Sequence, residues 1–399
     1  MSAGEVRVGV VGAGIIGLAV ARRLLETRPD VAVTIFDKEQ SVGAHQTGHN
    51  SGVVHAGLYY PRDSLKARLC RRGVGLLKDY CQDRGIAYDE CGKTVVAVTA
   101  DEVPRLRDIE ERATHNGVPG LRRLGAEEIR EHEPHITGVA GLHSPSTAIV
   151  DFVAVARSYA DDVRAGGGTL LLGTRVEGIE RVGDTVRVDA AGERHEFDHV
   201  VLCAGLQSDR VAQLAGDDQG PAIVPFRGEY LTMRPRAAHL VRGLVYPVPD
   251  PRYPFLGVHF TRRIDGTVDI GPNAVLSTAR EGYRRSDLVL RDLAETLAWP
   301  GFRRMARQHW RMGLTEMRGS LSRRTFIAGA RRYLPELTVA DVDGRHAGVR
   351  AQALDRDGSL VDDFRISRLG RITAVRNAPS PAATSSLAIA EHLCDGLLT

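Results

Sequence analysis

Three glycines near the N-terminus have the spacing of a phosphate-binding turn. Gly12, Gly14 and Gly17 form a GxGxxG motif that follows an apolar run. The first glycine permits a tight turn, the second lets backbone approach a pyrophosphate, and the third lets helix and strand pack closely. Asp37 lies about 20 residues further on, where a carboxylate hydrogen-bonds a ribose hydroxyl. These residues predict binding of the ADP half of a dinucleotide.

The segments around these glycines have the pattern of a strand–helix–strand unit. Residues 6–11 are apolar without alternation, as in a strand buried on both faces. Residues 15–25 carry apolar side chains at helical spacing, and residues 31–36 form a second β-rich run. Such a unit points the free N–H groups of the helix toward a phosphate. An ordinary strand–turn–helix is the plainer interpretation, which the position of Asp37 disfavours.

A run of small residues near the C-terminus favours FAD over NAD, which the glycine motif alone does not distinguish. Residues 377–386 contain only Asn, Ala, Pro, Ser and Thr and lead into a helix expected from Ala382 to Leu398. Small residues there let the positive end of the helix approach the flavin pyrimidine edge, where reduction places negative charge. The apolar strand that ends at Ala204 and Gly205 is expected to close over the same cofactor.

Periodicity and turn residues predict the remaining elements. Helices are expected at 65–83, 103–115, 127–133, 153–165, 286–299 (with Ser286 as N-cap), 302–313 and 323–334. Strands are expected at 94–99, 170–172, 176–181, 185–189, 195–202, 345–357 and 371–376, with strand-rich sequence over 224–271.

Composition restricts the class of protein. The 399 residues are 43% hydrophobic and 26% charged, which is typical of a globular chain long enough for two domains. A net charge of +3 without a dense basic block argues against a nucleic-acid partner. The five cysteines show no metal-ligand spacing, so we expect reduced thiols and no metal. No signal peptide and no apolar run of about 18–20 residues is evident, so a cytoplasmic location without a transmembrane segment is expected.

Several segments, in order along nearly the whole chain, resemble one enzyme family. The most specific are HQTGHNSG at 45–52 and LGVHFT at 256–261. The others lie at 43–44, 53–60, 64–67, 225–230, 246–249, 271–275, 281–283, 347–353 and 377–383. These segments are similar to those of the L-2-hydroxyglutarate dehydrogenases and oxidases, in the D-amino-acid-oxidase-like superfamily of FAD-dependent oxidoreductases. The resemblance implies oxidation of L-2-hydroxyglutarate to 2-oxoglutarate with noncovalent FAD, and peripheral membrane contact.

Oxidation of a 2-hydroxy acid needs groups that hold carboxylates and a base that takes the hydroxyl proton. His49, His259 and His55 are candidate bases, because imidazole titrates near neutral pH, although each could be a hydrogen-bonded structural residue. The candidate substrate ligands within the similar segments are Arg227, Lys66, Arg350, Tyr60 and Tyr246. Lys66 has the plain alternative of starting a surface helix.

The expected cofactor site draws on both ends of the chain and on the loop after the second strand. The residues expected to contact FAD are Gly12, Gly14, Ile15, Ile16, Gly17, Asp37, Lys38, Thr47, Gly48, Asn50, Ser51, Gly52, Val176, Ala204, Gly205, Pro379, Ser380, Ala382, Ala383 and Thr384.

The expected fold is α/β, with a three-layer Rossmann-like FAD-binding domain and an inserted antiparallel β-sheet substrate domain. Residues 1–90, 146–222 and 335–399 are assigned to the first domain, and 91–145 and 223–334 to the second. Oxidation of another hydroxy acid, an amino acid or an amine stays open, as does a flavin-binding protein without turnover, because a fold does not fix a function. Oxygen, a quinone and a carrier protein stay open as electron acceptors for the small-molecule substrate.

Overall fold

The N-terminal strand lies in the middle of a six-stranded sheet. In the computed structural model, which describes residues 5–250 and 257–397, β1 (Val6–Val11) pairs in parallel with β2 (Val31–Phe36) and β13 (His199–Leu202). The parallel strands β9 (Thr169–Leu171) and β21 (Ile372–Asn377) extend the sheet, and β20 (Arg365–Leu369) closes one edge in antiparallel orientation. The apolar run of β1 is therefore buried on both faces, as predicted.

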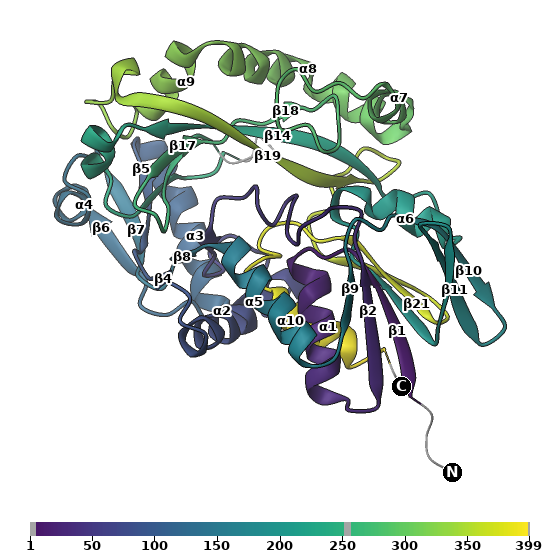
Figure 1. Cartoon of the computed structure of the whole chain (residues 1–399). Coiled ribbons are helices and arrows are strands. Elements are labelled where there is room, and N and C mark those ends of the chain that lie inside the picture. The colour runs from purple at the N-terminus through teal and green to yellow at the C-terminus, as the bar shows by residue number, and fades with distance from the viewer. Residues whose placement is uncertain (1–4, 251–256, 398–399) are drawn as a thin grey trace.

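Two different layers cover this sheet (Figure 1). One face packs against α1 (Ile15–Thr27), α2 (Leu65–Asp83), α5 (Phe152–Ala165) and α10 (Ser386–Cys394). The other packs against the antiparallel sheet of β10 (Val176–Val182), β11 (Thr185–Ala190) and β12 (Glu193–Phe197). This arrangement confirms the expected three-layer α/β fold, and α6 (Ser208–Leu214) follows β13.

A larger sheet lies across the carboxyl ends of these strands (Figure 1). Its nine strands are β18 (Val275–Leu276), β14 (Ala222–Met233), β17 (Val268–Gly271), β16 (His259–Arg262), β15 (Leu244–Pro247), β5 (Lys93–Ala97), β7 (Ala140–Ser144) and β6 (Arg122–Gly125), with β19 (Val342–Leu354) beside β14. All of its neighbouring pairs are antiparallel except β15 with β5.

Helices cover the large sheet, and short elements join it to the other half. Figure 1 shows α7 (Leu290–Ala298), α8 (Pro300–Leu321) and α9 (Arg323–Ala330) over the side of β14 and β19 that faces away from the six-stranded sheet. The other helices of this half are α3 (Val103–His115) and α4 (Ala126–His132). The small sheet contains β3 (Val53–Val54), β8 (Ala148–Val150) and β4 (Tyr88–Asp89), and 3-10 turns lie at Ala100–Glu102, Gly205–Gln207, Pro235–Leu240 and Val339–Asp341.

Several expectations differ from the structure. The strand expected at 195–202 is two strands, β12 and β13. They separate at Asp198, which exchanges hydrogen bonds with Arg7, so that β12 pairs with β11 and β13 pairs with β1. The helix expected from Ser286 begins at Leu290, since Asp287 accepts from the Arg284 N–H at 2.8 Å and holds 284–289 as a loop. The sequence placed 335–399 with the FAD domain, whereas β19 pairs with β14 along its length.

The last helix also differs at its start. It begins at Ser386 rather than Ala382, and the preceding residues form turns. Its expected end at Leu398 lies outside the described residues, as does Leu256 of the similar segments.

Candidate active site

The glycine motif combines two packing glycines with one that faces open space. A Cβ on Gly12 would lie 2.4 Å from the Cys203 carbonyl oxygen, and one on Gly17 would lie 2.0 Å from the Gly12 oxygen. A Cβ on Gly14 would meet only the Thr47 hydroxyl, at 3.6 Å. Gly14 precedes α1 and lines a cavity, so the protein itself leaves room there for a ligand phosphate.

Asp37 and Thr47 organise the chain around this turn. The Asp37 carboxylate accepts hydrogen bonds from the Ala13 and Glu39 N–H groups at 2.6 and 2.8 Å. The Thr47 hydroxyl accepts from the Ile15 N–H at 3.1 Å, at the start of α1. The loop after β2 is thereby held against the motif, and Asp37 lies at the cavity wall.

A cavity of about 1520 Å³ runs from this turn to the large sheet. Its wall includes most of the residues predicted from sequence. The predicted cofactor residues that line it are Gly12, Gly14, Ile15, Ile16, Asp37, Lys38, Thr47, Asn50, Ser51, Val176, Ala204, Gly205, Pro379, Ser380, Ala382, Ala383 and Thr384. Among the described residues, Gly17, Gly48 and Gly52 are not part of the lining.

Lys38 sits in a charged cluster at the cavity wall. Its ammonium donates to Glu39, lies 3.0 Å from the His45 Nε2, and donates to Glu281 at 2.9 Å. The oxygen and nitrogen atoms of Glu39, His45 and Glu281 have the spacing of metal ligands, but Lys38 already supplies the positive charge among them. The cluster therefore joins the loop after β2 to the 281 segment.

The C-terminal turns are fixed against the cavity by close contact with α2. A Cβ on Gly73 of α2 would lie 2.6 Å from the Thr384 carbonyl oxygen, so only glycine permits this approach. The Thr384 hydroxyl accepts from the His55 N–H at 3.1 Å, and the His55 Nε2 lies 3.2 Å from the Ser380 hydroxyl. The predicted small-residue segment thus lines the cavity through turns that precede α10.

His259 is held in one tautomer. Its Nδ1 lies 2.9 Å from the Gly257 carbonyl oxygen, which can only accept, so Nδ1 carries the proton and Nε2 has a free lone pair. The ring is buried in the cavity wall and stacks on Tyr246 at 3.9 Å. Burial, together with the nearby charges of Lys93 and Arg350, lowers the pKa of His259 to about 3. His259 is consequently a neutral hydrogen-bond acceptor near pH 7.

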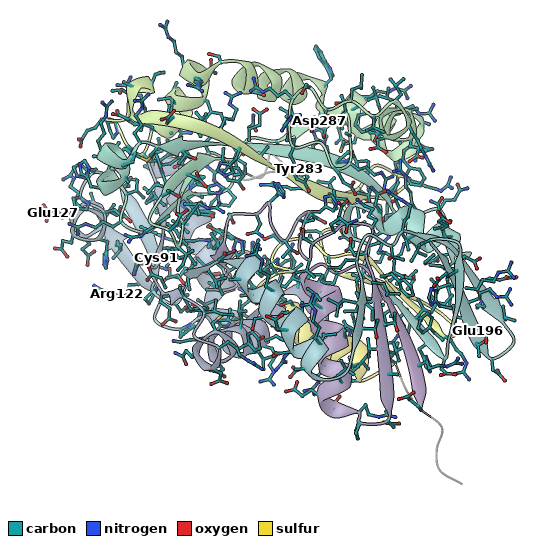
Figure 2. All side chains as sticks on the ribbon, viewed as in Figure 1. Cys91, Arg122, Glu127, Glu196, Tyr283 and Asp287 are labelled. Carbon is teal, nitrogen blue, oxygen red and sulfur yellow. The ribbon has the colours of Figure 1, made fainter. Side chains whose placement is uncertain are left out.

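His55 and His49 lie at the same cavity but in different surroundings. Burial, together with the charges of Lys93 and Lys66 and the neighbouring His259, lowers the pKa of His55 well below its usual value. His49 is exposed, and its ring stacks on Tyr283 at 3.7 Å. Figure 2 shows Tyr283 at the side of the large sheet that faces the six-stranded sheet.

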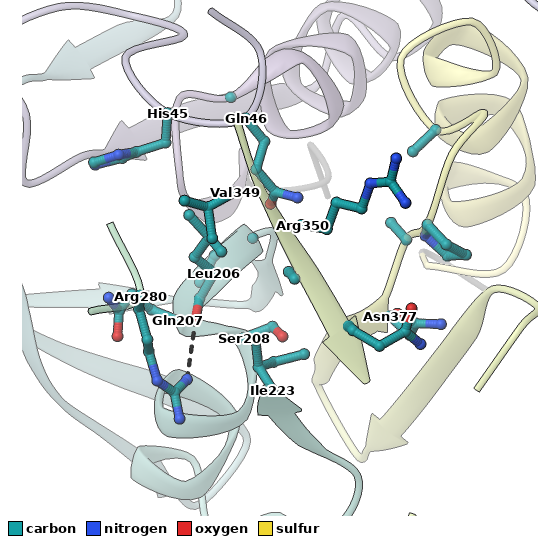
Figure 3. A pocket seen from close by; sticks show the side chains of 18 of the residues that line it. His45, Gln46, Leu206, Gln207, Ser208, Ile223, Arg280, Val349, Arg350 and Asn377 are labelled. Carbon is teal, nitrogen blue, oxygen red and sulfur yellow. Dashed lines mark hydrogen bonds between the residues drawn. The ribbon is translucent and has the colours of Figure 1, made fainter. Parts of the chain in front are cut away.

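Two predicted cations reach the cavity and a third does not. Lys66 and Arg350 line it, and Figure 3 shows the Arg350 guanidinium extending from β19 toward the C-terminal segment. Arg227 lies on the opposite face of β14, since side chains alternate along a strand and Gly228 faces the cavity. Arg227 forms an ion pair of 3.3 Å with the buried Glu229.

The electrostatic neighbours show which of these groups lie near one another on the wall. Lys66 and His259 are close enough to lower the pKa of His55, and Arg350 is close enough to lower the pKa of His259. The wall therefore presents a cation, two imidazoles and a second cation. In the same structure the Lys66 ammonium donates to the Asp362 carbonyl and carboxylate at 2.8 and 2.9 Å.

The two predicted tyrosines differ, and sequence reasoning missed several neighbours. Tyr246 lines the cavity, whereas Tyr60 is buried behind it, with the Lys66 ammonium 5.1 Å from its ring centre. The residues missed were Lys93, Tyr230, Glu281, Tyr283 and Gly348. Their signal lies in tertiary contacts: a Cβ on Gly348, for example, would lie 2.3 Å from the His49 carbonyl oxygen.

These features fit FAD. The space at Gly14, the carboxylate of Asp37 and the small-residue turns at 379–384 lie along one cavity that ends at the cation–imidazole wall. No helix within 5–250 and 257–397 is long and apolar enough to cross a membrane.

Comparison with known proteins identifies the family. A model of the family "FAD dependent oxidoreductase" matches residues 7–396. The chain is 45% identical to L-2-hydroxyglutarate dehydrogenase of Homo sapiens, covering 97% of this chain and 87% of the relative. It is 42% identical to the L-2-hydroxyglutarate dehydrogenases of Indibacter alkaliphilus (99% of each chain) and Escherichia coli K12 (98% and 92%).

Solved structures share the fold at lower identity. L-alpha-glycerophosphate oxidase from Mycoplasma pneumoniae, solved with FAD bound, has a TM-score of 0.79 at 21% identity and covers 97% of this chain and 93% of its own. L-proline dehydrogenase from P. horikoshii has a TM-score of 0.72 at 18% identity, with 99% and 95% covered. The chain therefore belongs to the FAD-dependent oxidoreductases and, within them, to the L-2-hydroxyglutarate dehydrogenase family.

Proposed function

We propose that this protein binds FAD in the cavity and oxidises L-2-hydroxyglutarate to 2-oxoglutarate. The observation that carries the proposal is the wall on which Lys66 and Arg350 flank His55 and His259, in a chain of this family. A five-carbon dicarboxylate needs a partner for each carboxylate and a base for its hydroxyl, all positioned at once. The wall has each of these groups.

Each residue has a distinct role in the proposal. Arg350 binds the carboxylate next to the reacting carbon, and Lys66 exchanges its contact with Asp362 for the distal carboxylate. The His259 Nε2 accepts the hydroxyl proton while the C2–H bond breaks, and the C2–O bond becomes a carbonyl. FAD, when bound, supplies the acceptor for the hydride from C2.

The protonation state of His259 suits a base that works on an anion. A pKa of about 3 leaves the imidazole neutral before substrate binds. Two carboxylates bound beside it favour the imidazolium and raise that pKa, which improves proton acceptance. His49 and His55 are the alternative bases, and Tyr246 supports His259 by stacking.

The cofactor is proposed to bind without a covalent link. The cavity-lining glycines, Asp37 and the C-terminal turns are the groups that would hold it, and Gly17, Gly48 and Gly52 shape the supporting turns. Acid precipitation should leave free FAD in the supernatant. Flavin retained on the precipitated polypeptide would replace this view with a covalent link through the loop that contains His45 and His49.

The two sheets are proposed to bind different ligands. The six-stranded sheet with its two covering layers is proposed to hold FAD, and the nine-stranded sheet, including β19, to hold the substrate. The cytoplasmic location and the contact with an acceptor at a membrane surface remain predictions. Cell fractionation with and without a high-salt wash tests both, because salt releases weak electrostatic docking.

The proposed substrate is tested by a panel offered to the holoenzyme without oxygen. L-2-hydroxyglutarate should bleach the flavin absorbance, whereas D-2-hydroxyglutarate, L-2-hydroxybutyrate and L-glutamate should do so much more slowly or not at all. The monocarboxylate tests the need for the distal cation, and the amino acid tests amine oxidation. Bleaching by L-glutamate alone would replace the proposal with amino-acid oxidation.

A further inference from the structure

Lys93 is a buried lysine behind the substrate wall. It opens β5, beside Leu244 of β15, and only 1% of it is exposed. Its ammonium lies 3.9 Å from the centre of the Tyr246 ring and 5.5 Å from that of Tyr59. Within the described parts of the chain no carboxylate forms an ion pair with it.

Lysine side chains usually lie at the protein surface, whereas Lys93 is buried. Burial of an ammonium without a counter-ion is costly, so the neutral form is favoured. Accordingly, burial lowers the pKa of Lys93 to about 7, with the thiols of Cys70 and Cys91 as the nearest opposing influence. A buried group of this kind beside a cavity is a candidate for a functional role.

Tyr246 connects Lys93 to the cavity. The tyrosine ring lines the cavity and stacks on His259, while the ammonium lies against the same ring. The charge of Lys93 also lowers the pKa of both His55 and His259. Lys93 thus acts electrostatically on the stretch of wall that lies between Lys66 and Arg350.

We propose that Lys93 is a positioning residue for the substrate. The charge of Lys93 behind the Tyr246 ring favours dicarboxylates in the cavity, and Lys93 takes up a proton when a dicarboxylate binds. The inference rests on the proposed function for the identity of the ligand. It assigns a third cation to the dicarboxylate, in addition to Lys66 and Arg350, and makes affinity depend on pH.

Lys93 is the member of its surroundings that changes charge near neutral pH. Burial raises the pKa of Cys70 and Cys91 to about 12 and that of Tyr59 and Tyr246 above their usual value. His55 and His259 have lowered pKa values and are neutral at pH 7. The groups that face Lys93 are therefore uncharged at pH 7: Tyr59, Cys70, Cys91, Tyr246, His55 and His259.

The sign of the effect follows from linkage. A bound dianion stabilises the charged form of Lys93 and raises its pKa in the complex. Affinity is then greatest below the pKa of the free protein, about 7, and falls as pH rises through it, by at most tenfold per pH unit. Binding at pH 8 should be accompanied by proton uptake.

The test uses holoenzyme with glutarate, a dicarboxylate that lacks the reacting hydroxyl, and with butyrate as the monocarboxylate control. Perturbation of the flavin spectrum gives each Kd between pH 6 and 9, and calorimetry in two buffers at pH 8 gives the proton uptake. For Lys93→Met we expect a glutarate Kd roughly tenfold higher at pH 6, no pH dependence through neutrality, no proton uptake, and little change for butyrate.

Two further variants separate the charge from structure. Lys93→Arg, which stays charged, should bind glutarate tightly without the weakening above pH 7. Lys78→Met removes a half-exposed lysine paired with Glu90 and should behave as wild type. The proposal is overturned if Lys93→Met keeps the wild-type Kd and pH profile, or if wild type shows no proton uptake.

Failure of the two proposals would look different. If wild type binds glutarate with this pH dependence but does not oxidise L-2-hydroxyglutarate, the proposed function fails and the role of Lys93 stands. If wild type oxidises L-2-hydroxyglutarate but Lys93→Met changes only thermal stability, Lys93 is structural. Should Lys93→Met not fold, the profile of Lys93→Arg against wild type decides, since only a titrating lysine gives a pH-dependent Kd.

Discussion

A backbone carbonyl determines which nitrogen of His259 can take a proton. Because the Gly257 oxygen accepts from Nδ1, the free lone pair lies on Nε2, and the stack on Tyr246 fixes the plane of the ring. His49 also donates Nδ1 to a carbonyl, that of His45, but it lies in an exposed position. Burial and not hydrogen bonding therefore distinguishes the two candidate bases.

Replacement of His259 by alanine should slow flavin reduction about 10²–10⁴-fold while FAD stays bound, since this is the usual contribution of a positioned base. His49→Ala is the matched control and should remain within a fewfold of wild type. Anaerobic stopped-flow reduction measures both. Near wild-type reduction by His259→Ala would transfer the role of base to His55.

The pH profile provides an independent check on the same residue. The sequence predicted a limb near neutral pH for the base, but a pKa of about 3 places its protonation in the free protein far lower. The value of kcat/KM, which reports on the free protein, should therefore not fall between pH 8 and 5 through protonation of His259. A limb near neutrality should occur in KM instead, through Lys93.

The two candidate arginines should separate activity from stability. Arg350→Met removes a cavity-lining cation and should raise KM roughly 10–100-fold, the usual effect of a lost charge-assisted hydrogen bond. Arg227→Met should leave KM within about twofold but lower the free energy of unfolding by about 1–3 kcal/mol, because the buried Glu229 loses a partner. Steady-state kinetics measures KM, and denaturant unfolding measures the free energy of unfolding. A large rise in KM for Arg227→Met together with an unchanged KM for Arg350→Met would contradict this account.

At the scale of elements, the turn between β1 and α1 assigns different tasks to its glycines. Gly17 and Gly12 let strand and helix meet, whereas Gly14 leaves the space that the proposed phosphate occupies. A substitution at Gly17 therefore affects folding, and one at Gly14 affects the ligand.

Gly14→Val should yield a folded protein that no longer retains FAD, whereas Gly17→Val should fail to fold because its Cβ would lie 2.0 Å from the Gly12 oxygen. Gly75→Ala in α2, where a Cβ meets nothing within 4 Å, is the control and should stabilise by about 0.5–1 kcal/mol. Flavin content and circular dichroism measure these outcomes. Full flavin content in Gly14→Val would place the phosphate elsewhere.

Elements with a strong local signal were predictable, and those set by distant contacts were not. The bounds of α2 and α3 match the expectation, because amphipathic spacing and the Ser64 cap of α2 lie in the local sequence. The start of α7 was wrong because Thr278, in the segment after β18, accepts from the Val289 N–H at 3.2 Å. Together with the hydrogen bond from the Arg284 N–H to Asp287, this contact holds the preceding segment in a loop.

At the scale of the whole molecule, the site arises where the two sheets face each other. The glycine motif could be predicted because one local unit contains it, and the resemblance supplied His259, Lys66 and Arg350. Lys93 could not be predicted as part of the site, since its position depends on β5 lying beside β15, a pairing between residues about 150 positions apart in sequence. The exclusion of Arg227 likewise needed the alternation along β14 in three dimensions.

The central claim is that this cavity, with FAD bound, oxidises L-2-hydroxyglutarate. Anaerobic titration of the purified holoenzyme with L-2-hydroxyglutarate, followed by flavin absorbance and by quantification of 2-oxoglutarate, tests it most directly. We predict complete bleaching with one 2-oxoglutarate formed for each flavin reduced. A flavin that stays oxidised with L-2-hydroxyglutarate, while dithionite or another hydroxy or amino acid bleaches it, would contradict the claim.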